Sequence, residues 1–277
     1  MRATGRDRRS GSARTVPVTP LEDPDHRIGR ADLTRWPSWC RPLVRAAERL
    51  AARLGPYGVY LLPLAVGAAV FGIGAVSFGE VDEGVRERGD LAALDEPALR
   101  LAMSLRTPFL DTAVTGFTDI GGPVLAPILT VLVVAAITVV RRSWTPVLVV
   151  VPAAAGSLLT TSVGKRIFGR ARPAFADAVP PYEHSPSFPS GHALNAVVIA
   201  GAVAYVLLLR RSTARGRAAV VVVAAAYAIG IGLSRVFLGH HWLTDVVAAW
   251  ALGAAWLAVV ITVHRLFLTV RRTHRRV

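Results

Sequence analysis

The sequence predicts an all-α integral membrane protein: a six-helix bundle preceded by an amphipathic interfacial helix. Two features of the composition favour a membrane, because 53% of the 277 residues are apolar and only 18% are charged. Soluble domains are about 45–50% apolar and about 25% charged. The third observation is a series of long apolar stretches, which gives the number of helices.

The chain begins with two polar segments of different character. Residues 1–35 are rich in Arg, Pro, Asp and Ser, and we expect a disordered basic cytoplasmic tail. In residues 36–56 arginines recur at every fourth position from Arg41 to Arg53, opposite a Trp- and Leu-bearing side. This spacing predicts an amphipathic helix that lies on anionic lipid headgroups, the alternative being a soluble helix packed on a partner.

Six apolar stretches follow, and each is long enough to cross a bilayer, which takes roughly 17–25 residues. They are residues 57–79, 122–140, 144–163, 193–209, 218–237 and 242–263. We expect residues 57–265 to form one membrane domain and residues 266–277 to form a second basic cytoplasmic tail.

The arginines predict the orientation of the bundle. Short loops with many arginines remain in the cytoplasm, and two such loops are Arg141-Arg142 and the four arginines between residues 210 and 217. Both termini are then cytoplasmic in a multi-pass protein of the cell inner (plasma) membrane. The net charge of +14 is therefore a signal of orientation and membrane contact rather than of nucleic-acid binding.

The longest external connection is residues 80–121. It begins acidic and continues as Pro97–Phe117, where apolar residues recur at helical spacing. We expect a half-buried helix along the membrane interface there, without a chemical role.

Ionisable residues are rare in membrane spans unless they have a function. Three clusters of them lie at predicted helix ends, at residues 165–173, 189–192 and 234–245. The first two share one loop, and two spans separate the second from the third. All three clusters therefore lie on the same side of the bilayer, which is the external side.

The residue types in these clusters suit a phosphate-like anion. Lys165, Arg172 and Arg235 supply cationic donors for phosphoryl oxygens. Ser190 and Gly191 precede a helix, whose first N–H groups are free to bind an anion.

The same clusters contain groups for nucleophilic and acid–base chemistry. His241 and Asp245 are four residues apart and share a helix face, so the carboxylate can fix the tautomer of the ring. His240 is five residues from Asp245 and fits that face less well, so we expect His241 to be the nucleophile. His192, from another helix, is placed to donate a proton to the leaving oxygen.

Taken together, the three clusters resemble the type 2 phosphatidic acid phosphatase family, membrane lipid phosphatases that share their site with vanadium haloperoxidases. The matching patterns are KxxxxxxRP at Lys165–Pro173, PSGH at Pro189–His192 and SRxxxxxHxxxD at Ser234–Asp245. The six-helix pattern extends the resemblance over roughly residues 57–265.

The resemblance implies that His241 attacks phosphorus to form a phosphohistidine, that Asp245 orients it and that His192 acts as acid and then base. Lys165, Arg172, Ser190, Gly191 and Arg235 would hold the phosphoryl oxygens. No metal or other cofactor is expected, and the single cysteine, Cys40, excludes a Cys-based metal site.

The implied substrate is a lipid phosphate: phosphatidic acid, phosphatidylglycerophosphate or undecaprenyl diphosphate. The alternatives are a non-catalytic lipid-phosphate binder or transporter, a vanadate-dependent peroxidase, and a basic tail that binds DNA. The expected partners are this substrate and anionic headgroups at the cytoplasmic face, with no nucleic acid. The oligomeric state stays open.

Several polar residues receive no role in the predicted site. We expect Arg166 and Arg170 to be charges at its rim, His184 to be exposed, Asp177 and Glu183 to be isolated in their loop, and His264 and His274 to lie on the cytoplasmic surface.

Overall fold

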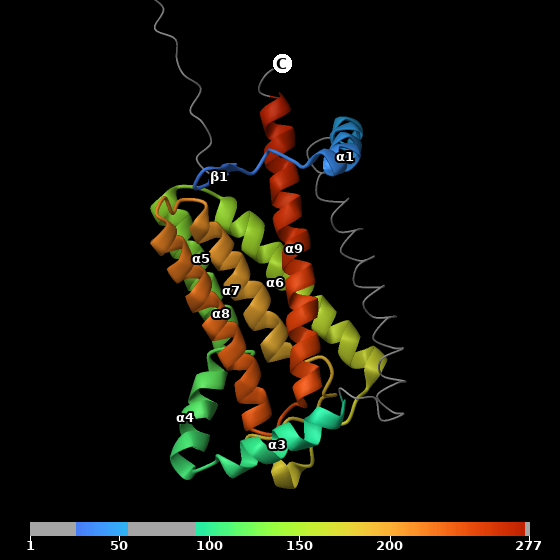
Figure 1. Ribbon diagram of the computed structural model, residues 1–277, viewed down its shortest axis with the longest axis vertical. Helices are drawn as coiled ribbons and strands as arrows, with labels where there is room; N and C mark the ends of the chain where they lie inside the picture. Colours follow the sequence, from blue (N-terminus) through green and yellow to red (C-terminus); the bar gives the residue numbers. More distant parts are fainter. Residues whose placement is uncertain (1–25, 55–91, 275–277) are drawn as a thin grey trace, which may run out of the picture.

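The computed structural model describes residues 26–54 and 92–274, and within them the chain is mostly helical. The elements are β1 (Arg27–Ile28), β2 (Ala31–Asp32), the 3₁₀ turn Ser38–Cys40, α1 (Arg41–Leu54), the 3₁₀ turn Ala92–Leu94, α3 (Asp95–Ser104), α4 (Pro108–Asp119), α5 (Leu125–Arg141), α6 (Thr145–Phe168), the 3₁₀ turn Phe175–Asp177, α7 (Gly191–Leu208), α8 (Ala214–Phe237) and α9 (Leu243–His274). Helices α5 to α9 extend along the long axis, with α3 and α4 across one end (Figure 1).

Four of the predicted spans, α6, α7, α8 and α9, are helices long and apolar enough to cross a membrane. Helix α5 is equally apolar but shorter, at 17 residues. The predicted span at residues 57–79 lies outside the described residues. The protein is therefore a helical membrane protein, as its composition predicts.

Helix α7 lies at the centre of the bundle and packs against α6, α8 and α9. Most of its buried residues are small or β-branched: Ala193, Val198, Ala202 and Val206, for example, are fully buried. Lipid tails are as apolar as these side chains, so membrane helices associate through close packing, which small residues allow. This packing fixes the position of the N-terminus of α7, where the PSGH segment lies.

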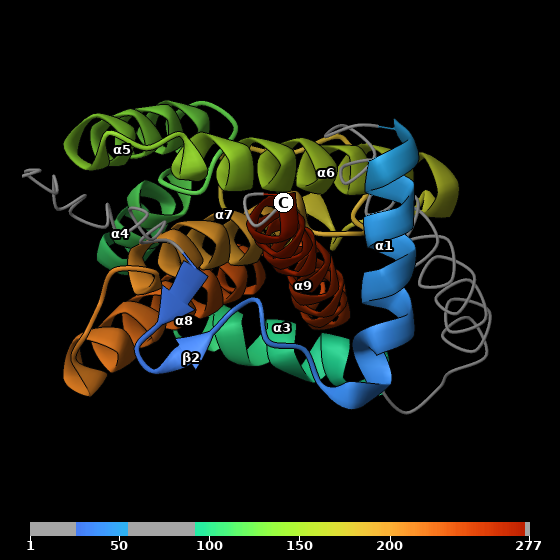
Figure 2. The same cartoon turned by 90° about the horizontal axis from the view of Figure 1, so that it is seen from above.

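The segment expected to form the amphipathic helix contains α1, which begins at Arg41 rather than at Trp36. Pro37 has an extended backbone that ends the preceding loop, and Pro42 is compatible with a first helical turn. Helix α1 is seen nearly end-on in Figure 1 and side-on in Figure 2, so it runs across α9 rather than along it. Val44 and Trp36 pack against Leu266 and Val270 of α9.

Two expectations for the polar termini differ from the structure. Residues 26–35, expected to be disordered, contain a β-hairpin in which Arg27 pairs with Asp32. Its anchor is Leu33, which is buried in the main core and whose carbonyl accepts a hydrogen bond from Arg265 Nε at 3.0 Å. Helix α9 continues through residues 266–274, because its apolar side there packs against α1.

The segment Pro97–Phe117, expected to be one helix, is two. Helix α3 ends at Ser104, and α4 begins at Pro108. Thr107 is extended, as the residue before a proline usually is, and its hydroxyl accepts a hydrogen bond from Leu110 N at 3.2 Å. The two helices contact α8, and α3 also contacts α9, at the end where the predicted site lies.

Candidate active site

The three predicted clusters meet at one end of the bundle. The C-terminal ends of α6 and α8 and the N-terminal ends of α7 and α9 lie together there, at the end opposite the C-terminus of the chain (Figure 1). Loops 169–190 and 238–242 connect them, so the residues of all three motifs face one region.

A glycine turn at the end of α8 brings Arg235 and His241 together. Gly239 has a φ of +71°, which L side chains rarely adopt, and a Cβ there would lie 2.3 Å from Asp177 O. The backbone N–H groups of His240 and His241 both donate to Arg235 O, at 3.0 and 3.2 Å. The residues between Arg235 and His241 in the third motif therefore end α8 and form one tight turn, which accounts for their number.

The PSGH segment packs closely on α6. A Cβ at Gly164 would lie 2.6 Å from Pro189 Cδ, so only glycine permits this contact next to Lys165. Ser190 is the N-cap of α7, and its buried hydroxyl has no hydrogen-bond partner among the described residues. The hydroxyl and the first N–H groups of α7 are thus available to an anion at the positive end of the helix dipole.

His241 and Asp245 lie side by side in the interior, 1% and 0% exposed, with Nδ1 of the ring 3.6 Å from Oδ2 of the carboxylate. Ser187 bridges them: its hydroxyl donates to Asp245 Oδ2 and lies 3.3 Å from His241 Nδ1. Asp245 Oδ2 also accepts the backbone N–H of Trp242 at 3.0 Å. Ser187 was not expected from the sequence, where it lies between the first two motifs.

The other ring nitrogen of His241 faces a cation. Arg172 Nη1 lies 3.2 Å from His241 Nε2, and because a guanidinium can only donate, Nε2 is the acceptor and Nδ1 carries the proton. Burial, together with the charges of Arg172 and Arg235, keeps the pKa of His241 well below its ordinary value. The ring is therefore neutral near pH 7, with its lone pair directed to the cationic side of the site.

The three predicted cations converge on the loop before α7. Lys165 Nζ donates to Ser185 Oγ at 2.8 Å and to Pro186 O at 2.7 Å. Arg172 Nε donates to Ser185 O at 2.6 Å. Arg235 is 2% exposed, and its Nη1 lies 3.3 Å from Thr118 Oγ1 of α4.

Glu183 is not isolated in its loop, contrary to expectation. Its carboxylate forms ion pairs with Arg172 Nη2, at 2.7 Å, and with Arg235 Nη2. Burial alone would raise the pKa of Glu183, but the two guanidinium groups lower it to about 2. His192 lies in the first turn of α7, directly after Gly191.

Arg170 is not a rim charge, which corrects a second expectation. Its guanidinium lies between two buried carboxylates, donating from Nη1 to Asp245 Oδ1 at 2.6 Å and from Nη2 to Asp95 Oδ2 at 2.8 Å. Its place two residues before Arg172, in the first motif, was the only sequence signal for a role. Asp95 gave none, because it lies 75 residues earlier in a segment expected to have no chemistry.

The remaining histidines divide as follows. His240 Nε2 donates to Val179 O at 2.7 Å, so its ring points to the loop rather than to Asp245. His264, expected on the surface, is buried, and its Nδ1 lies 2.8 Å from Tyr205 Oη. His184 and Arg166 are exposed, as expected. Across residues 26–54 and 92–274 no three His, Cys, Asp or Glu side chains gather in a group that could hold a metal ion.

Comparison with known proteins agrees with this geometry. The model of the PAP2 superfamily matches residues 146–268, which include all three motifs. Phosphatidylglycerophosphatase B of Bacillus subtilis is 34% identical over 160 residues, covering 57% of this chain and 77% of that protein.

Two solved structures are similar. The crystal structure of a transmembrane PAP2-type phosphatidylglycerolphosphate phosphatase from Bacillus subtilis has a TM-score of 0.55 and 27% identity, covering 80% of this chain and 96% of the other. That of Aquifex aeolicus LpxE has a TM-score of 0.49 and 23% identity, covering 60% and 94%. Given the motifs, the matching family model and the relative that is 34% identical, the chain belongs to the type 2 phosphatidic acid phosphatase (PAP2) superfamily.

Proposed function

We propose that this PAP2-type hydrolase removes phosphate from a membrane lipid through a phosphohistidine on His241. The observation that carries the proposal is the buried His241–Ser187–Asp245 chain with Arg172 on the opposite ring nitrogen. It supplies a neutral imidazole with a fixed tautomer and a lone pair on the phosphate side, which is what an attacking nitrogen needs.

In the first step the Nε2 lone pair of His241 forms a bond to phosphorus, and the bond from phosphorus to the leaving oxygen breaks. His192, which takes up a proton when the anionic phosphate binds beside it, donates that proton to the leaving oxygen. Asp245, through Ser187, stabilises the positive charge that the ring acquires. Lys165, Arg172, Arg235, Ser190 and the N–H groups at Gly191 hold the phosphoryl oxygens, whose charge they stabilise in the transition state.

In the second step water attacks the phosphohistidine. His192, now neutral, takes a proton from that water as the new P–O bond forms. The P–N bond then breaks, so inorganic phosphate is released and His241 returns neutral with its lone pair restored.

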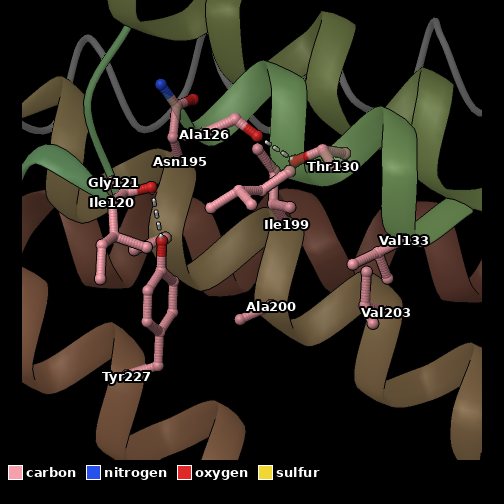
Figure 3. A pocket seen from close by; sticks show the side chains of 12 residues that line it. Ile120, Gly121, Ala126, Thr130, Val133, Asn195, Ile199, Ala200, Val203 and Tyr227 are labelled. Atoms are coloured by element: carbon pink, nitrogen blue, oxygen red, sulfur yellow. Dashed lines mark hydrogen bonds between the residues drawn. The ribbon is translucent and has the colours of Figure 1, made fainter. Parts of the chain in front are cut away.

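An apolar pocket beside the site supports a lipid substrate. It has a volume of about 210 Å³ and lies between α5, α7 and α8 (Figure 3). Asn195, one turn after His192, and Ile120 lie at one end, and Val133 and Val203 at the other. Ile120 is two residues from Thr118, which contacts Arg235. From Asn195 to Val203 the pocket therefore extends about 12 Å along α7, away from the residues proposed to bind phosphate. The tail of a lipid phosphate would extend in the same direction.

The substrates that fit this proposal are phosphatidic acid, phosphatidylglycerophosphate and undecaprenyl diphosphate. Of these three lipids, phosphatidylglycerophosphate has the most support, because the relative that is 34% identical is named phosphatidylglycerophosphatase B. All three place a phosphoryl group at the membrane surface on an apolar tail.

The proposal is tested by phosphate release from these three lipids, using detergent-purified protein in EDTA with His241→Ala beside the wild type. We expect release by the wild type and a loss of at least about 10³-fold in the variant, because the attacking nitrogen is gone. Equal release by both proteins would refute the mechanism. Comparison of kcat/KM among the lipids identifies the substrate.

For the topology we propose six spans, the first at residues 57–79, with cytoplasmic termini, an extracytoplasmic site and α1 on the cytoplasmic surface. The test replaces Cys40 by Ala and introduces a single cysteine at exposed Ala176, near the site, or at exposed Ser212, at the opposite end. An impermeant thiol reagent should label the first in intact cells and the second only after permeabilisation. The reverse pattern would overturn the orientation.

A further inference from the structure

The carboxylate of Asp245 is held on both sides. It is fully buried, so its orientation depends on its partners rather than on water. One oxygen, Oδ2, receives Ser187 and the N–H of Trp242, as described above. The other, Oδ1, receives Arg170 Nη1 at 2.6 Å. Removing Arg170 would leave half of the carboxylate without a donor among these contacts.

Arg170 is fixed in turn by Asp95 of α3. Asp95 Oδ2 accepts from Arg170 Nη2 at 2.8 Å and from Thr244 Oγ1 at 2.7 Å, and Oδ1 accepts from Thr244 N at 2.9 Å. Arg170 Nη1 also lies 2.8 Å from Thr244 Oγ1. These bonds form a closed ring of Asp95, Arg170 and Thr244, which joins α3 to the first turn of α9. Asp245 is attached to this ring through Arg170 Nη1.

The ring separates Arg170 from the phosphate-binding cations. Both Nη atoms of Arg170 are engaged by carboxylates within the protein, and its side chain is 16% exposed, against 5% for Asp95. The positive charge of Arg170 is therefore already balanced. By contrast, Arg172 and Arg235 share one carboxylate, Glu183, and Arg172 also lies against Nε2 of His241.

We propose that Asp95 and Arg170 form a positioning pair for the reaction, which rests on the proposed function of His241 and Asp245. Asp95 orients the guanidinium of Arg170, Arg170 orients Asp245, and Asp245 with Ser187 orients the ring of His241. Asp95 precedes residues 146–268, the part matched by the family model, so the connection between α3 and α9 supplies an element of the site from outside that match.

The test measures kcat and KM for Arg170→Gln, Asp95→Asn and the double variant with a long-chain lipid phosphate. We expect kcat to fall roughly tenfold to a hundredfold in Arg170→Gln and about three- to tenfold in Asp95→Asn, because a misplaced nucleophile slows the chemical step. KM should change by less than about twofold, since the phosphate donors remain. The double variant should be no slower than Arg170→Gln, because the two residues act through one path.

Matched controls are Glu96→Gln and Arg100→Gln, which remove exposed charges of the same helix and should retain the wild-type kcat. The nearly isosteric Asp95→Asn provides the test if Arg170→Gln does not fold. Unchanged kcat in a folded variant, a loss confined to KM, or additive losses in the double variant would each overturn the proposal. If the wild type released no phosphate and His241→Ala did not differ from it, the proposed function would be refuted instead. Failure of the positioning pair and failure of the proposed function are therefore distinguishable.

Discussion

His241, Ser187 and Asp245 are connected so that each group fixes the protonation of the next. Because Arg172 can only donate to Nε2 of His241, the ring proton is on Nδ1, where Ser187 Oγ accepts it while donating its own proton to Asp245. The direct distance from His241 Nδ1 to Asp245 Oδ2, 3.6 Å, is too long for a hydrogen bond. The serine hydroxyl therefore connects the ring of His241, the proposed nucleophile, to the carboxylate of Asp245.

Ser187→Ala should therefore lower kcat roughly tenfold while KM changes by less than about twofold. The substitution removes the hydroxyl that connects His241 to Asp245 but leaves every cationic phosphate donor in place. Steady-state kinetics with a lipid phosphate measures both constants. Ser212→Ala, an exposed serine at the opposite end, is the control. A kcat equal to that of the wild type would show that the serine makes no contribution to orientation.

Glu183 carries a pH-dependent part of the stability. Its pKa in the folded protein, about 2, lies below its ordinary value of 4.5, so folding favours the ionised carboxylate. The stabilisation is complete above pH 4.5 and is lost as the pH falls from there toward 2. Glu183→Gln should thus have a lower Tm than the wild type at pH 7, with a difference that narrows below pH 4.5.

The measurement is thermal unfolding in detergent at a series of pH values. Added inorganic phosphate should raise the Tm of Glu183→Gln more than that of the wild type, because it replaces the lost anion between Arg172 and Arg235. A difference in Tm that stays constant from pH 7 to pH 3 would contradict the assignment.

At the scale of elements, length and apolarity were sufficient to predict α5 to α9 among the described residues but not their exact ends. Residues 145–168, 191–208 and 214–237 are helical within a few residues of the predicted limits. The end of α9 was underestimated because its last turns pack on α1, a contact between distant segments. Likewise the break at Thr107 depends on a local cap that the apolar pattern does not reveal.

In the site, too, contacts within one motif could be predicted, whereas contacts between distant parts of the sequence could not. His241, Asp245 and the motif cations could be predicted, because their spacing on one helix or loop carries the signal. Glu183 and Ser187 could not, since Arg235 lies 52 residues from Glu183, Asp245 lies 58 residues from Ser187, and the residue types are common in loops. Asp95 was hidden for the same reason, with Arg170 75 residues away.

The turn that ends α8 provides a prediction at this scale. Gly239→Ala should reduce the stability by roughly 1–3 kcal/mol for the positive φ alone, and more because its Cβ would meet Asp177 O at 2.3 Å. It should also lower kcat, because the turn places His241 relative to Arg235. Unfolding and kinetics measure both effects.

The matched control is Gly169→Ala. This glycine has a φ of +54°, but nothing lies within 4 Å of a Cβ there. Only the backbone cost applies, so Gly169→Ala should be the milder variant in Tm. Equal effects of the two substitutions would show that the contact with Asp177 does not matter.

At the scale of the whole molecule, the buried charges and the apolar surfaces are distributed along the long axis. The described cations of the site lie at the end covered by α3 and α4 (Figure 1), and the pocket of Figure 3 leads from there between α5, α7 and α8. A lipid phosphate has the same distribution, with a charged end and an apolar tail. If the proposed function holds, the two ends of such a substrate bind to separate surfaces of the bundle, whose effects on kinetics can be measured separately.

Ala200→Phe should narrow the pocket at its middle and thereby distinguish substrates by tail length. We expect kcat/KM for a long-chain phosphatidic acid to fall about tenfold, because the tail loses its apolar contacts, each buried methylene contributing about 0.8 kcal/mol. For a water-soluble short-chain analogue kcat/KM should stay within about twofold, since the phosphate groups are untouched. Val222→Phe introduces the same side chain on the exposed side of α8, away from the pocket, and should affect neither substrate. Equal losses for both substrates in Ala200→Phe would mean that the substitution acts through the helix packing around His192 and that the tail binds elsewhere.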